Sequence, residues 1–160
     1  GINTGYLILG TVGGNHRIDT TVISDAVNIA ARLEELTKHY GVSLLISQDT
    51  LDQLDAPEQY SIRLIDKVQV RGRTAVLNVF EVFDADPLEV RIQKLNTRHE
   101  FELALTFYHL QNFQEAIPRF KACLDHNLGD RAAKTYLHHA QNQVRQGFEL
   151  WRSRSPLGEV

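Results

Sequence analysis

The chain has 160 residues, of which 42% are apolar and 23% charged, and its 17 basic and 20 acidic side chains give a net charge of −3. These values are typical of a folded globular domain, and the negative charge argues against nucleic acid or an anionic membrane surface as the main partner. No apolar run approaches the ~20 residues of a membrane-spanning helix. Cys123 is the single cysteine and has no partner for an internal disulfide, so we expect a reducing compartment.

The first half of the chain alternates strand and helix patterns. Apolar and β-branched runs predict strands over residues 6–12, 42–46, 61–70 and 75–83, with a turn at 71–73. A helix is predicted over residues 24–39, because Ser24 can cap its start and Gly41 lies just beyond its end. Ser47 can cap a second, short helix that runs to about residue 54. Interleaved strands and helices predict an α+β or α/β sheet with packed helices.

The second half reads as helical. Residues 88–110, 113–125 and 130–146 predict three helices joined by short turns. Pro87 disfavours continuation of the strand before it, so we place a boundary there. The predicted organisation is a mixed region over residues 1–86, an all-α segment over 87–150 and a flexible tail over 151–160. Because a strand pattern opens directly at Gly1, we also expect part of the functional unit to lie upstream of Gly1.

Asn28 and Arg32 are the candidate ligand-binding residues of the predicted helix. Their spacing of four residues places both side chains on one helical face, one turn apart. Arginine supplies bidentate donors for phosphate oxygens, and an asparagine amide can bind a sugar or ring oxygen. The pair indicates a phosphorylated ligand, although spacing alone favours the alternative of an exposed arginine beside an asparagine near the helix start.

The segment around this pair resembles the catalytic domain of class III nucleotidyl cyclases, the adenylate and guanylate cyclases. The resemblance rests on residues 1–5 (GINTG), 10–13 (GTVG), Arg17, 21–34 (TVISDAVNIAARLE), 41–47 (GVSLLIS) and 70–73 (VRGR). These motifs extend to about residue 83 and match the C-terminal part of the family's domain. The resemblance implies an α+β fold, a partial cyclase domain with a ferredoxin-like sheet and packed helices, followed by an all-α tail.

The resemblance implies roles for four residues. Asn28 and Arg32 fall on the family's transition-state pair, in which Asn orients the ribose and Arg offsets charge on the phosphoryl group as the 3′-hydroxyl attacks. Thr21 falls on the base-reading position, where a hydroxyl favours ATP over GTP. Arg71 stands where the family has a lysine that reaches the terminal phosphates, and a solvated basic turn is the alternative for this residue.

The chain departs from the family's pattern in two respects. Ser24 replaces a glycine, and its Cβ would disturb the strand-to-helix turn if the backbone there needs a positive φ. The family's two aspartate ligands for Mg²⁺ or Mn²⁺, and its base-reading lysine, have no counterpart in the chain, because Asp19 and Asp25 do not occupy those positions. We therefore expect this fragment alone to be inactive. Since the family builds its sites at a homodimer interface, the expected partners are ATP and a second cyclase subunit.

From about residue 97 the chain resembles a tetratricopeptide repeat, a two-helix motif of 34 residues. The matching positions are Leu103, Ala104, Phe107, Ala116, Phe120 and Cys123, and Leu137 falls on the position of Leu103 in a next repeat. Pro118 inside the second helix departs from the pattern. We expect a helical cap or dimerisation element, with binding of a protein partner as the alternative.

The leading hypothesis is the C-terminal fragment of an adenylate cyclase, whose intact form converts ATP to cyclic AMP and pyrophosphate. A guanylate cyclase is a smaller variation of it. The catalytic part is expected in the cytoplasm, with a membrane anchor of the parent protein left open. The alternative is a non-catalytic assembly module of a degenerate cyclase-like half and the helical tail. Retention of Thr21, Asn28 and Arg32 argues against such decay.

Overall fold

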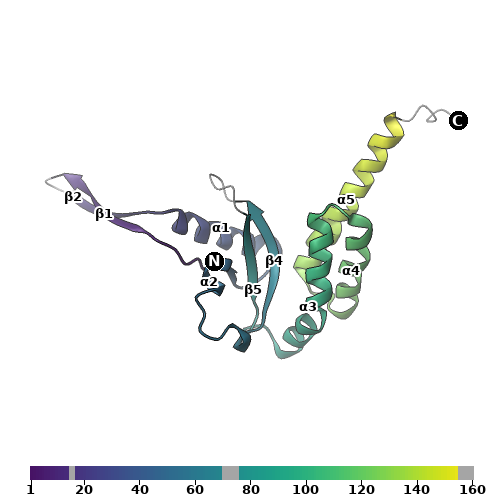
Figure 1. Cartoon of the computed structure of the whole chain (residues 1–160), viewed down its shortest axis with the longest axis horizontal. Coiled ribbons are helices and arrows are strands. Elements are labelled where there is room, and N and C mark those ends of the chain that lie inside the picture. Colours follow the sequence, from purple (N-terminus) through teal and green to yellow (C-terminus); the bar gives the residue numbers. More distant parts are fainter. Residues whose placement is uncertain (15–16, 70–75, 155–160) are drawn as a thin grey trace. The chain divides into compact units, whose positions relative to one another are not determined.

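The computed structural model describes residues 1–14, 17–69 and 76–154, and gives the backbone alone for 9–14, 17–23 and 148–154. The chain divides into two compact units, residues 1–85 and 86–160. The first unit is α+β and the second is helical, which confirms the predicted fold class (Figure 1). Within the described residues, no helix combines the length and the apolar character that a membrane span needs.

A three-stranded antiparallel sheet forms the centre of the first unit. Its strands lie in the order β3 (Leu45–Ser47), β5 (Val76–Val82) and β4 (Ile62–Gln69). The short helix α2 (Gln48–Leu51) follows β3 and is capped by Ser47, whose hydroxyl accepts from the N–H of Thr50. A turn of 3₁₀ helix, η1 (Pro57–Gln59), precedes β4. The turn predicted at residues 71–73 lies outside the described residues.

The first residues of the chain lie along the outer edge of β3. The N–H of Ile2 donates to the carbonyl of Leu45 at 2.9 Å, and the N–H of Ser47 donates to the carbonyl of Ile2 at 3.1 Å. After this parallel contact the chain enters β1 (Ile8–Gly14), which pairs with β2 (Arg17–Ile23) in a separate antiparallel hairpin (Figure 1). The last residues of β2 lead directly into the main helix of the unit.

That helix, α1 (Asp25–Tyr40), lies within a residue of its predicted bounds. Ile29, Leu33 and Tyr40 form its buried side. Tyr40 Oη donates to Asp66 Oδ2 on β4 at 2.7 Å, which ties the last turn of the helix to the sheet. Gly41 then adopts a φ of 65°, a left-handed conformation that glycine enters at little cost, and the helix ends there as predicted.

A buried ion pair crosses the sheet between β4 and β5. Arg63 and Glu81 are cross-strand neighbours, and Nε of Arg63 lies 2.6 Å from Oε2 of Glu81. Both side chains are almost completely inaccessible, at 0% and 1% exposure. Loss of either partner would remove this short contact from a low-dielectric environment, which is costly for the charge that stays buried.

The second unit contains three helices, α3 (Leu88–His109), α4 (Phe113–His126) and α5 (Arg131–Arg154). All three were predicted, but α5 extends eight residues beyond its predicted end, into the segment expected to be a tail. A single glycine, Gly147, lowers helix propensity without removing a backbone hydrogen bond, so it does not end the helix. Pro118 is likewise accommodated inside α4, which continues to His126.

Three aromatic rings form the core of the helical unit, one from each helix. Phe120 and Tyr136 stack with centroids 5.5 Å apart, and Phe101 meets Phe120 edge-on at 5.7 Å. Small residues at the crossings allow the helices to approach, and those that are fully buried include Ala104, Ala116, Ala132, Ala133 and Ala140. This packing does not confirm the resemblance to a tetratricopeptide repeat, which stays a prediction.

We expect Glu81→Ala to lower the free energy of unfolding by about 3–5 kcal/mol, because the buried Arg63 would lose its short contact with the Glu81 carboxylate. The measurement is urea denaturation followed by circular dichroism. Lys38→Ala is the matched control, since it breaks the exposed pair of Lys38 with Glu34 and should unfold like the parent chain. A Glu81→Ala variant as stable as the control would contradict the assigned role of the buried pair.

Candidate functional site

Asn28 and Arg32 lie one turn apart on the exposed part of α1, as their spacing predicts. Both line a shallow depression of about 300 Å³ beside the sheet. Val68 of β4 and Leu77 of β5 form its apolar side. These two residues face each other across the sheet register, so the strands and the helix together shape the depression.

Neither side chain of the pair is engaged elsewhere. Within the described residues, Asn28 and Arg32 make no side-chain hydrogen bond or ion pair. Glu34 on the same helix behaves differently, because Lys38 Nζ lies 2.9 Å from its Oε1 and this hydrogen bond lowers the pKa of the Glu34 carboxyl. The guanidinium and the amide are therefore available to a ligand.

Two acidic side chains share the depression with this pair. Asp25 and Glu35 line it together with Asn28 and Arg32. Sequence reasoning did not select them for this site. Residues 25, 28, 32 and 35 are three or four positions apart, however, and this spacing indicates a common helical face. The lining of the depression therefore carries charges of both signs.

Ser24 fits its position without strain. Its φ is −165° and its ψ is 140°, an extended conformation that any residue can adopt. The turn from β2 into α1 therefore does not need the positive φ that would make a glycine necessary. The Cβ of Ser24 does not disturb this turn, and its hydroxyl caps α1 by accepting from the N–H of Ala26 at 2.9 Å.

The other two predicted site residues are less completely described. Thr21 lies on β2, opposite Gly10 of β1 and four residues before α1 begins, and the structure gives its backbone alone. Arg71 lies outside the described residues. The roles of both residues in binding a base or a phosphate stay predictions.

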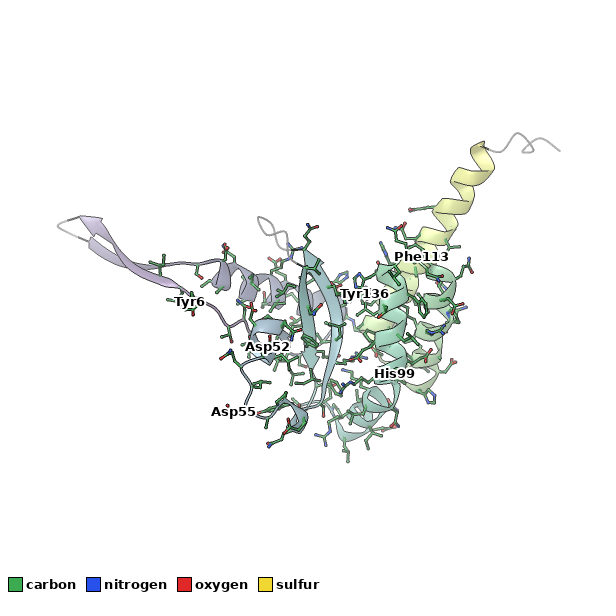
Figure 2. The ribbon with its side chains drawn as sticks, viewed as in Figure 1. Tyr6, Asp52, Asp55, His99, Phe113 and Tyr136 are labelled. Carbon is green, nitrogen blue, oxygen red and sulfur yellow. The ribbon has the colours of Figure 1, made fainter. Side chains whose placement is uncertain are left out.

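A second and larger depression, of about 720 Å³, lies at the start of α1. Its lining includes the carboxylates of Asp25, Asp49 and Asp52 (the last is labelled in Figure 2). Within the described part of the chain, however, no three acidic, histidine or cysteine side chains converge well enough to hold a metal ion. These residues do not fit the two-ion centre that the sequence resemblance implies.

Comparison with known proteins places the first unit in a family. The family described as the adenylate and guanylate cyclase catalytic domain matches residues 1–82, which include β1 to β5 and α1. An adenylate cyclase of Anabaena cylindrica is 49% identical over 83 residues, 51% of this chain and 16% of the relative. Adenylate cyclase 1 of Rhizobium meliloti is 35% identical over 82 residues, 51% of this chain and 12% of the relative.

A third relative matches the helical unit as well. The terminal-differentiation-specific adenylate cyclase of Dictyostelium discoideum is 31% identical over 146 residues, 91% of this chain but 7% of the relative. The chain thus spans 7% to 16% of the length of these three proteins. By the match over residues 1–82, the chain belongs to the family of adenylate and guanylate cyclase catalytic domains.

Proposed function

We propose that residues 1–86 form the C-terminal part of an adenylate cyclase catalytic domain, which converts ATP to cyclic AMP and pyrophosphate. The observation that carries the proposal is the unpaired Asn28 and Arg32 at the edge of one depression. Family membership supports cyclase chemistry, and the three relatives described above are named adenylate cyclases. The protein that contains these residues within a whole catalytic domain is called the complete cyclase below.

In the proposed reaction the ribose 3′-oxygen attacks the α-phosphorus and loses its proton. The bond between the α-phosphorus and the oxygen that bridges to the β-phosphate breaks, and pyrophosphate leaves. Arg32 donates to the α-phosphoryl oxygens, where negative charge accumulates in the transition state. Asn28 holds the ribose by a hydrogen bond from its amide, which keeps the 3′-oxygen in line with the bond that breaks.

Two further residues select and hold the nucleotide in this proposal. The Thr21 hydroxyl accepts a hydrogen bond from the adenine amino group, and so favours ATP over GTP. Arg71 contacts the terminal phosphates, where its charge replaces that of a lysine with a different geometry. The alternative function is a non-catalytic assembly module. It predicts that substitution of Thr21 or of Arg71 would not alter nucleotide binding.

The metal ions of the complete cyclase are assigned to residues outside this chain. Mg²⁺ or Mn²⁺, when bound, would activate the hydroxyl and offset phosphate charge. Because the described residues do not fit such a centre, we propose that a second cyclase subunit in a homodimer brings the ions to Asn28 and Arg32. Residues 1–160 alone are then inactive, and the reaction takes place in the cytoplasm, where ATP is available.

Substitution of the arginine tests the proposed chemistry. We expect Arg32→Ala to lower kcat of the complete cyclase by about 10²–10³-fold, because a transition-state donor is lost. Arg32→Lys should restore little of the rate, since an ammonium cannot reproduce the planar donor pair. The measurement is cyclic AMP formation from ATP at saturating Mg²⁺. An unchanged kcat in both variants would reject the proposed role of Arg32.

The same helix offers a test that separates function from folding. Arg32→Ala should leave the unfolding of the 160-residue chain unchanged, because the side chain is exposed and has no described partner. Leu33→Ala, one position further, should cost about 2–5 kcal/mol, because Leu33 is buried at 1% exposure. Thermal unfolding of both variants is the measurement. Equal losses of stability would show that Arg32 serves the fold.

A further inference from the structure

Ser24 joins the start of α1 to the segment that precedes β1. Its Oγ accepts from the N–H of Ala26 at 2.9 Å and donates to the carbonyl of Tyr6 at 2.6 Å. A hydroxyl carries one donor and two acceptor sites, so it can make both bonds at once. One side chain therefore caps the helix and ties its first turn to a neighbouring stretch of backbone. Tyr6 contributes its carbonyl to this tie, while its ring is fully exposed (Figure 2).

The tied turn is the one that carries Asn28. The N–H of Asn28 donates to the carbonyl of Ser24 at 3.5 Å. The same turn is held a second time, because Asn3 Nδ2 donates to the carbonyl of Ala26 at 3.1 Å. One turn further along, Gly1 lies so close to α1 that a Cβ on it would stand 2.4 Å from the carbonyl oxygen of Ala30. Residues 1–6 thus run against the first half of the helix.

We infer that Ser24 is a positioning residue for Asn28 and Arg32. This inference rests on the proposed function and adds to it the device that fixes the pair. Apolar packing of Ile29 and Leu33 is non-directional, whereas a hydrogen bond has a preferred geometry and resists rotation of the first turn or a shift along the helix axis. The Ser24 hydroxyl opposes both movements, because each would lengthen its bond to Tyr6. A displacement of ~1 Å at reacting groups can lower a rate by about 10²-fold.

Three variants separate this role from a merely structural one. Ser24→Ala removes both hydrogen bonds of the hydroxyl. Ser24→Gly also removes the tie to Tyr6, but glycine is tolerated at a helix N-cap, so the helix itself is largely kept. Ser24→Thr retains a hydroxyl and should behave like the parent protein.

The readouts are kcat and KM for ATP in the complete cyclase, and amide hydrogen exchange in the 160-residue chain. We expect Ser24→Ala and Ser24→Gly to lower kcat by about tenfold with little change in KM, and Ser24→Thr to restore it. Exchange at residues 26–28 should accelerate in the Ala and Gly variants, while exchange in the second half of α1 stays as in the parent chain. The thermal midpoint should fall in Ser24→Ala, which loses the N-cap, and stay near the parent value in Ser24→Gly.

Several results would overturn the inference. An unchanged kcat in the Ala and Gly variants would do so, as would a loss that Ser24→Thr does not restore. A fall in kcat confined to Ser24→Ala, the variant that also loses the N-cap, would assign Ser24 to the fold alone. Arg32→Ala is measured in parallel: a normal rate in that variant rejects the proposed function itself, whereas a low rate there with normal Ser24 variants rejects only the positioning role.

Discussion

The packing of α1 against the three-stranded sheet is the constraint on which the rest of the first unit depends. Ile29 and Leu33 are buried against the sheet. Asn28 directly precedes Ile29 in the chain, and Arg32 directly precedes Leu33. Successive residues of a helix differ in direction by about 100°, so Asn28 and Arg32 lie at the border between the buried and the solvent-facing sides. Both line the same depression as Val68 and Leu77, and both are exposed. Burial of two aliphatic side chains thereby sets the face of α1 on which the guanidinium and the amide lie.

Some charged side chains of the first unit are buried and paired, whereas Arg32 is exposed. Buried charges have partners: Arg63 pairs with Glu81, and Asp66 accepts from Tyr40. These contacts join β4 to β5 and the end of α1 to β4, so they hold the scaffold. Arg32, in contrast, is exposed and unpaired within the described residues. Within the described residues this arginine adds no ion pair to the scaffold, and this difference supports the ligand-binding role proposed for it and for Asn28.

Local signals in the sequence were sufficient for α1, because Ser24, the apolar period and Gly41 all act within a few residues of one another. The same holds for α3 and α4, whose separating turn uses Asn112 as a cap.

Long-range pairings were not predictable in this way. Nothing near Arg63 in the chain indicates Glu81, and the link from Ser24 to Tyr6 requires the path of residues 1–6, which only the assembled sheet defines. Gln111 adopts a φ of 59° without being a glycine, so its left-handed conformation was not predictable from its residue type, although the turn itself was predicted. Pattern therefore located Asn28 and Arg32, but not Asp25, Glu35 or the apolar wall beside them.

A short stretch of chain connects the last strand of the first unit to the first helix of the second. The N–H of Ser61, just before β4, donates to both carboxylate oxygens of Asp84, at 3.1 and 2.9 Å, which closes the end of the β4–β5 ladder. α3 begins four residues later, at Leu88.

The family match ends at residue 82, yet the similarity to the Dictyostelium cyclase covers 91% of the chain and so includes most of the helices. Because the aromatic core of Phe101, Phe120 and Tyr136 lies entirely within residues 86–160, the helical unit has the internal packing of a separate structural element.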